Sequence, residues 1–252
     1  MKAIYLGNVS KRLMAQSEKY LKLRKQRGMT LLEIIIVLGI IGTIAAGVVI
    51  LAQRAYDNKA ISDLVSNTST VRTAIKETYG PSGVYPAVNS ADSLSLTESG
   101  IKTSTAPIAV LIQLGKLSSS ESKNNVSSNF FNVGGARVGT AAAAGGANPA
   151  NKAFFVEVNG LDQKQCRNVL LQAGNQWDFV NVVTTGGGAG SYTQNAAPDL
   201  SATALTTLAT TSGGAGGILR SLATGGTNVI TPQNVIAYCS DSANNSIVLG
   251  SR

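Results

Sequence analysis

Glu33 is the residue whose chemistry most needs an explanation, because it is a carboxylate at the start of a long apolar run. From Ile34 to Leu51 the chain has no charged residue and no proline. A helix over this run is about 30 Å long, which is enough to cross a bilayer core. An acidic side chain in such a span costs at least ~2.5 kcal/mol. Glu33 therefore either reaches headgroup water at the membrane interface or has a partner elsewhere.

The other groups that carry chemistry are sparse. The chain has no histidine, which removes the usual general base, the Ser-His-Asp and Cys-His pairs and the commonest metal ligand. The glycine tracts at 186–190 and 213–217 are not followed by Lys-Ser or Lys-Thr, as a phosphate-binding loop requires. Acidic residues such as Asp178, Asp199 and Asp241 are scattered singly, without the ligand spacing of a calcium loop. We expect no catalytic site, no metal and no cofactor.

The two cysteines, Cys166 and Cys239, have 72 residues between them. In an exported domain an even cysteine count favours a disulfide, and closing a loop of this length stabilises the fold by ~4 kcal/mol in the chain-entropy model. The alternative is a pair of buried free thiols.

The net charge of +8 is not spread over the chain. Residues 1–28 hold eight Lys or Arg and one acid, a net +7, whereas residues 29–252 hold thirteen and twelve, a net +1. A basic segment beside an apolar span stays in the cytoplasm by the positive-inside rule, so the residues after Leu51 should lie across the membrane. The basicity thus belongs to the leader, and a nucleic-acid partner is not expected.

The junction between the leader and the span predicts where the chain is cut. A secretory signal peptide is cut after its apolar segment, behind an Ala-x-Ala arrangement, and Ala45-Ala46-Gly47 and Ala52 to Ala55 match that pattern poorly. Gly28 lies directly before the apolar run and can enter a protease cleft without side-chain hindrance. Cleavage after Gly28 would make Met29 the new N-terminus.

The stretch Gly28-Met29-Thr30-Leu31-Leu32-Glu33, with the apolar helix after it, resembles the prepilin-peptidase motif of bacterial type IV pilins. The long basic leader and Met29 in place of phenylalanine are similar to the type IVb subgroup, which includes toxin-coregulated, bundle-forming, longus and colonisation-factor pilins. The resemblance implies that the leader is discarded and the amine of Met29 is methylated. The implied partners are the prepilin peptidase/N-methyltransferase and the inner-membrane assembly machinery.

A filament of parallel helices gives Glu33 a partner. Each cleaved subunit has a positive amine at Met29 and a buried carboxylate at Glu33, and both are costly alone in a dry environment. We expect Glu33, with Thr30 of the same motif, to act in assembly by pairing with the Met29 amine of a neighbouring copy. Gly39, Gly42 and Gly47 allow either close helix packing or local unwinding on entry into the filament, and these interpretations are compatible.

Beyond Ala52 the helix becomes amphipathic. Apolar residues keep a spacing of three and four from Ile61 to Tyr79, with charged residues between them. Gly80-Pro81 should end the helix. This divides the chain into a leader (1–28), an apolar half-helix (29–52), an amphipathic half-helix (53–80) and a globular head (81–252).

Patterns in the head predict short helices and strands. Asp162 with Gln165 three residues on predicts a capping box, which would start a helix that ends at Gly174. The expected helices are Pro107–Leu117, Asp162–Gly174, Ser201–Ala209 and Gly217–Ala223; the expected strands are Asn151–Val158, Trp177–Val183, Ile230, Val235–Tyr238 and Ile247–Leu249. Thr140 to Gly146 reads as an exposed loop. A disulfide would then tie a helix at Cys166 to a strand ending at Cys239.

Further segments resemble the type IVb pilins: Leu51-Ala52-Gln53-Arg54-Ala55, Asn151-Lys152-Ala153-Phe154, Gly160-Leu161 and Gln165-Cys166. The resemblance implies an α+β fold, the type IV pilin α/β-roll, in which a long N-terminal helix packs on an antiparallel sheet. It also implies an αβ-loop at about 81–152 and a disulfide-bounded D-region at 166–239, the variable surface parts of the family.

The expected function is that of a major type IVb pilus subunit, a homo-oligomer. It starts in the inner membrane of a bacterium and ends in an extracellular filament for adhesion, auto-aggregation or colonisation, with the host-cell surface as a further partner. The alternatives are a minor pilin, a type II secretion pseudopilin and an uncleaved signal-anchored surface protein.

Overall fold

The structure is a computed structural model that describes residues 29–139, 151–205, 207–209 and 213–252. The chain divides into two compact units, residues 1–55 and 56–252, and each is described by itself. The leader with Gly28 and the predicted loop Thr140–Gly146 lie outside the described residues.

Helix α2 (Leu31–Tyr79) is the first element. Its start is capped by Thr30, whose Oγ1 accepts the backbone N–H of Glu33 at 3.2 Å. Its end passes into a single 3₁₀ turn, η1 (Gly80–Ser82), and Gly83 then takes φ +63°. The prediction of one helix from near Met29 to Tyr79 is confirmed.

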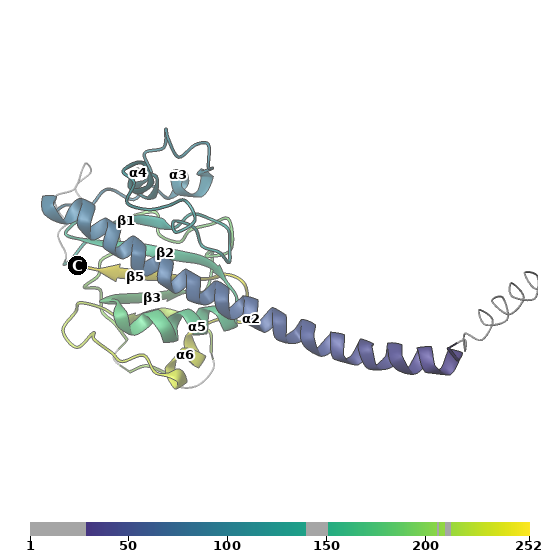
Figure 1. The fold of residues 1–252 in the computed structure, drawn as a ribbon. Coiled ribbons are helices and arrows are strands. Elements are labelled where there is room, and N and C mark those ends of the chain that lie inside the picture. Colours follow the sequence, from purple (N-terminus) through teal and green to yellow (C-terminus); the bar gives the residue numbers. More distant parts are fainter. Residues whose placement is uncertain (1–28, 140–150, 206, 210–212) are drawn as a thin grey trace, which may run out of the picture. The chain divides into compact units, whose positions relative to one another are not determined.

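The second unit is built on one antiparallel sheet in the order β1-β2-β5-β3-β4 (Figure 1). The strands are β1 (Asn132–Ala136), β2 (Ala153–Leu161), β3 (Phe179–Val183), β4 (Gly217–Arg220) and β5 (Asn245–Ser251). Phe154 pairs with Ser251, and Phe179 pairs with Gly250. The start of β2, the start of β3 and the end of β5 therefore lie together at one end of the sheet, where the strands begin or stop.

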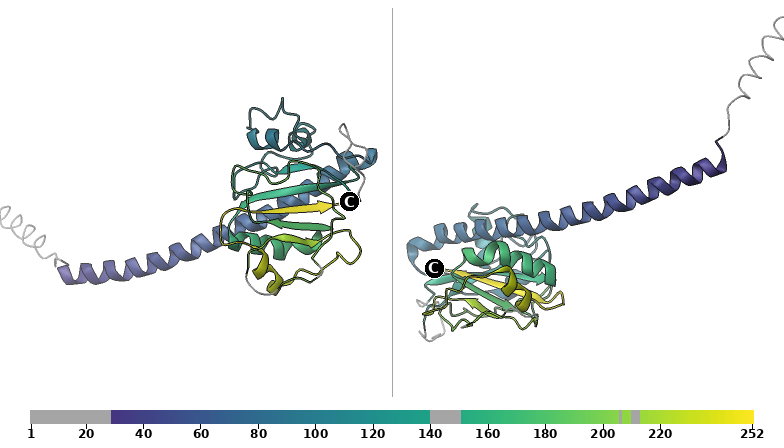
Figure 2. Two further views of the ribbon diagram at one scale, coloured as in Figure 1. Left: turned by 180° about the vertical axis from the view of Figure 1, so that it is seen from behind. Right: turned by 90° about the horizontal axis from the view of Figure 1, so that it is seen from below.

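The remaining helices are short. They are α3 (Ser90–Ser95), α4 (Pro107–Gln113), α5 (Gln163–Ala173), the 3₁₀ turn η2 (Gly174–Gln176) and α6 (Pro232–Tyr238). Figure 2 shows α5 on the same side of the sheet as the second half of α2, and α3 and α4 together at the β1 flank. Helices α2 and α5 therefore cover one face of the sheet, and loop residues such as Val88 and Leu200 pack on the other.

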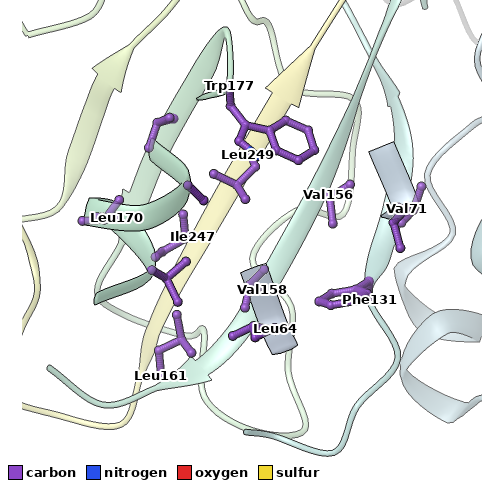
Figure 3. Close-up of a cluster of buried hydrophobic side chains, with 14 of the residues drawn as sticks. Leu64, Val71, Phe131, Val156, Val158, Leu161, Leu170, Trp177, Ile247 and Leu249 are labelled. Carbon is purple, nitrogen blue, oxygen red and sulfur yellow. The ribbon is translucent and has the colours of Figure 1, made fainter. Parts of the chain in front are cut away.

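The larger core lies between the sheet and these helices (Figure 3). The stripe predicted on α2 is buried there, from Ile61 through Leu64, Thr68 and Val71 to Ile75, while Tyr79 is only half-buried. The facing side chains alternate along the strands, with Phe154, Val156, Val158, Val180, Val182, Ile247 and Leu249 in the core. A smaller core on the opposite face joins Ala136, Ala153, Phe155, Phe179, Leu200 and Val248.

The α+β fold with a long N-terminal helix on an antiparallel sheet is confirmed. The helices predicted at 107–117 and 162–174 and the strands predicted at 151–158, 177–183 and 247–249 are present as α4, α5, β2, β3 and β5. The capping box of α5 is also present: Asp162 Oδ1 accepts Gln165 N–H at 2.7 Å, and Gln165 Oε1 accepts Asp162 N–H at 3.0 Å.

Two predicted helices were wrong. None of the described residues within 201–209 is helical, because the Asp199 carboxylate folds a turn by accepting the N–H and hydroxyl of Ser201, and Leu205 N–H donates to Ile218 O. Gly217–Ala223 begins as the edge strand β4, paired with β3. Apolar residues at helical spacing were overridden by sheet pairing.

A predicted strand at Val235–Tyr238 was also wrong, because this segment is helix α6. Thr231 accepts the N–H of Asn234, Asn234 Oδ1 accepts the N–H of Thr231, and Pro232 occupies the first turn. Ile230 lies in no strand; it is buried in the loop before α6. Cys239 consequently follows a helix and not a strand.

The edge strand β1 and the one-and-a-half-turn helix α3 were not predicted. Strand β1 has the sequence Asn-Val-Gly-Gly-Ala, whose glycines have low strand propensity. A Cβ on Gly134 would lie 2.8 Å from the Val88 side chain, so glycine is required there by close packing across the sheet face.

Candidate assembly surface

The apolar side chains in the first half of α2 are exposed, because no other described residue of the unit 1–55 packs on them. Its large apolar side chains are exposed throughout, from 37% at Ile34 to 78% at Leu31. An 18-residue window of this helix reaches a mean hydropathy of 3.0, so it is long and apolar enough to span a membrane. A continuous apolar surface of this kind marks a membrane or protein interface.

Glu33 and Thr30 lie together at the start of this surface. Thr30 acts as the helix cap through the hydrogen bond from Glu33 N–H. Over the described ranges, no hydrogen bond or ion pair within 4.0 Å involves the Glu33 carboxylate. Met29, directly before the cap, is 71% exposed. The partner that we expect for Glu33, the Met29 amine of another copy, stays a prediction.

The three glycines of the apolar half are notches in the helix surface. A Cβ built on Gly39, Gly42 or Gly47 meets nothing within 4 Å apart from the helix itself. The space is therefore open to a second helix, as close packing requires. Unwinding at these glycines stays a prediction.

The disulfide in the head is present. Cys166 and Cys239 are joined, with their Cα atoms 6.0 Å apart and both side chains fully buried. Cys166 lies on the buried face of α5, and Cys239 directly follows α6. The bond therefore joins two helices, where the sequence had led us to expect a helix and a strand. Gln163 Nε2 donates to Cys239 O and Arg167 Nη2 donates to Ile236 O, which reinforces the same contact.

A buried carboxylate, Glu157, organises the other face of the sheet. Its Oε1 accepts hydrogen bonds from Thr193 N, Thr193 Oγ1 and Ser246 Oγ, and its Oε2 accepts from Asn132 Nδ2 and Gln194 N, at 2.6 to 3.1 Å. Glu157 is fully buried. The Glu157 carboxylate thus accepts five hydrogen bonds and has no cation in hydrogen-bond contact. These bonds tie the loop at 193–194 to β1, β2 and β5. No sequence pattern marks Glu157, because an acid within a strand pattern carries no signal of burial.

The segment 186–200 forms a strap that starts at the end of β2, where Gly160 N donates to Gly187 O, and continues to the end of β1. Asn132 Nδ2 donates to Gln194 O, Arg137 N donates to Pro198 O, and Leu200 N donates to Arg137 O. Tyr192 Oη donates to Phe130 O in the same region. Burial raises the pKa of Tyr192, and the nearby Glu157 charge raises it further. Edge strands left bare pair with other chains. Here the strap contacts β1 at Asn132 and just beyond its end at Arg137, and Pro86 O accepts the N–H of Gly135 between them.

The glycine tracts form tight turns. A Cβ on Gly187 would lie 2.4 Å from Ser246 Cβ, and a Cβ on Gly216 would lie 2.5 Å from Val182 O. Gly216 also has φ +65°, which side chains rarely adopt. Both tracts therefore contain glycines that are fixed against the sheet.

Comparison with solved structures identifies the fold. The crystal structure of TcpA, a type IV pilin from Vibrio cholerae El Tor biotype, matches 77% of this chain and 99% of its own, with a TM-score of 0.57 at 24% identity. The long helix, the antiparallel sheet and the disulfide place this chain in the type IV pilin class of folds.

Sequence comparisons identify the family. The model of the toxin-coregulated pilus subunit TcpA matches residues 110–246, more than half of the chain, and the prokaryotic N-terminal methylation motif matches residues 23–49. Two toxin coregulated pilins are similar: one from Vibrio cholerae serotype O1, 37% identical over 165 residues, and one from Vibrio cholerae, 36% identical over 169 residues. These alignments cover 66% and 67% of either chain, respectively. The chain belongs to the toxin-coregulated pilus subunit family of type IV pilins.

Proposed function

We propose that this chain is the major structural subunit of a type IVb pilus, a homo-oligomer polymerised through α2. The observation that carries the proposal is the exposed apolar surface from Leu31 to Leu51. In lipid, close packing against like helices supplies the driving force for assembly. Once the filament leaves the membrane, the helix bundle keeps this surface out of water. The pilin fold and family membership support the same function.

Processing precedes assembly in this proposal. A prepilin peptidase/N-methyltransferase removes the leader 1–28 after Gly28 and methylates the amine of Met29. The methylation motif matched at 23–49 supports this, because it includes the junction. Before assembly the helix spans the inner membrane, where the assembly machinery takes it up. The mature regions are then 29–52 in the filament core, 53–80 under the head and the head itself, with an αβ-loop at 81–152 and a D-region at 166–239.

Register in the filament is set by Glu33 and Met29 of neighbouring copies. A carboxylate and an amine that both leave water gain from pairing, and each is costly if left alone. Thr30 fixes the helix start beside them through its cap. The open notches at Gly39, Gly42 and Gly47 support close approach of neighbouring helices, with local unwinding as a second use of the same glycines.

The head supplies the surface of the filament. We infer that it mediates adhesion, auto-aggregation or colonisation, with a host-cell surface as partner, and that the chain is a structural protein and not an enzyme. The relatives are named as pilins, which supports this.

The experiment that tests the proposal is to shear filaments from cells that express the chain and identify their subunits by mass. A major pilin is the most abundant protein of the sheared fraction. A minor pilin would be a trace component, a pseudopilin would stay in the periplasm, and a signal-anchored surface protein would stay with the membranes. Any of these three results contradicts the proposal.

A further inference from the structure

Basic residues gather at one end of the sheet, where the ends of several strands lie side by side. Four of the five strands have a basic residue at or next to the end that lies there: Arg137 after β1, Lys152 before β2, Arg220 at the end of β4 and Arg252 after β5. The register pairs Ala136 with Ala153 and Val180 with Arg220, which places these ends together. Helix α2 adds Arg72 and Lys76. We call these six residues the basic edge; Figure 1 shows the C-terminal end beside the end of α2 there.

Helix α2 is fixed to this edge by direct contacts. Arg72 Nη1 donates to Gln176 O at 2.7 Å, Arg72 Nη2 donates to Ser251 Oγ at 2.9 Å, and the guanidinium lies 4.9 Å from the Trp177 ring centroid. The Lys76 ammonium lies 6.0 Å from the Phe154 ring centroid. Both cations are thus held over aromatic rings at the strand ends.

Within the described residues of the second unit, no ion pair includes a residue of the basic edge. The ion pairs there are Lys59–Asp63, Lys116–Glu77, Lys123–Glu98 and Lys164–Asp57. Instead Arg220 donates to the carbonyls of Trp177 and Asn228, and Lys152 donates to that of Gly83. Two carboxylates, Asp178 and Asp199, lie among six cations. Burial lowers the pKa of Lys76 and the Arg72 charge lowers it further, against a smaller opposite effect of Asp178.

At the other end of the sheet, where the opposite ends of the strands lie, acidic residues gather. Asp162 follows β2, and Asp241 lies in the turn before β5, where Leu161 pairs with Asn245. Asp57 and Asp63 of α2 lie toward this end, since Lys164 at the start of α5 pairs with Asp57 at 3.6 Å. Two lysines contact these carboxylates in ion pairs: Lys59 with Asp63, and Lys164 with Asp57. We call Asp57, Asp63, Asp162 and Asp241 the acidic edge.

We propose that the basic edge of one head docks against the acidic edge of a second copy of this chain in the filament. This rests on the proposed function. Subunits that polymerise in one direction meet through two different surfaces, which must complement each other. The mature chain has a net charge of only +1, so the head is polarised and not basic overall. A head-to-tail partner of the same sequence fits that polarity better than a polyanion does. Charge complementarity also disfavours wrong orientations, because like-charged edges repel.

The test uses charge reversal in the full chain, expressed in a bacterium that assembles type IV pili. The variants are Lys152→Glu, Asp241→Lys and the two combined; all three change exposed side chains. Lys102→Glu, an exposed lysine in the loop between α3 and α4, is the matched control. Sheared filament is measured against the membrane pool, and the disulfide is checked on non-reducing gels to confirm that the head has folded.

We expect each single reversal at an edge to lower sheared filament roughly tenfold, the combined variant to recover most of it, and Lys102→Glu to match the wild type. Normal filament yield from Lys152→Glu, or a combined variant no better than the singles, would overturn the inference. So would Lys152→Glu filaments that form normally but lose retention on heparin, because the edge would then serve a polyanion. Failure of the proposed function is distinguishable, since the wild type itself would then yield no sheared filament.

Discussion

Cys166 and Cys239 are joined by a buried disulfide that links α5 to the end of α6, and therefore closes residues 166–239 of the head into one loop. The bond spans a sequence separation of 73 residues. A crosslink of this length removes conformational freedom from the unfolded chain, which is worth about 4 kcal/mol in the chain-entropy model.

We expect the double variant Cys166→Ser/Cys239→Ser to lose about 4 kcal/mol of unfolding free energy. Denaturant unfolding of the purified protein in detergent measures this, and the wild type after reduction is the matched control. An unchanged unfolding free energy in both would contradict a stabilising role for the bond.

Glu157 should be required for the strap 186–200. In Glu157→Ala five hydrogen-bond donors lose their acceptor in a buried site, at a cost of at least ~3 kcal/mol. Glu157→Gln keeps the size but turns one acceptor into a donor that faces other donors, so it should also destabilise. Amide hydrogen exchange at 191–195 should accelerate in both variants. Glu98→Gln, at an exposed carboxylate, serves as the control, and unchanged exchange in Glu157→Gln would count against the network.

The contribution of Asp199 to the stability of the head should be lost in acid. Burial raises the pKa of Asp199, but the hydrogen bonds from Ser201 Oγ, Ser201 N and Gly139 N and the Arg137 charge outweigh burial. The pKa of Asp199 therefore lies below the ordinary value of an aspartate. For a carboxyl with a lowered pKa, the stabilisation is present above the unfolded-state pKa and is lost as the pH falls through the folded-state pKa.

The difference in unfolding free energy between wild type and Asp199→Asn should therefore be largest at about pH 6 and should shrink toward about pH 2.5. Unfolding curves at the two pH values provide the measurement. A difference that grows in acid would contradict the hydrogen-bonding account.

Glu33 should be needed for filament growth and not for membrane insertion. Glu33→Ala and Glu33→Gln both remove the charge that we expect to pair with the Met29 amine of a neighbour. Insertion and cleavage should be normal, because the apolar run after Glu33 is unchanged, while sheared filament should fall to background. The membrane pool of cleaved subunit is the internal control. Normal pili from either variant would contradict the pairing of Glu33 with the Met29 amine.

Sequence patterns predicted the parts of the fold where one signal dominated. The uninterrupted run after Glu33 and the spacing from Ile61 to Ile75 predicted α2, and the reciprocal cap of Asp162 and Gln165 predicted α5. The even cysteine count indicated the disulfide. In each case local chemistry and tertiary packing favour the same structure.

The failures have physical causes in tertiary contacts. β4 and the segment after Asp199 follow pairing with β3 and hydrogen bonds to Ser201, which short-range spacing does not encode. For α6 a readable signal was missed, because Thr231-Pro232 with Asn234 is a capping arrangement. Burial of Glu157 and the polarity of the two edges depend on strand order, and strand order is not visible in the sequence.

The most direct test of the account is the mass of the N-terminal peptide of the subunit in sheared filaments. Cleavage after Gly28 and assembly through α2 predict a peptide that begins at Met29 and carries one added methyl group. A filament subunit that retains Met1 or any part of residues 1–28, or the absence of this chain from filaments, would contradict the account.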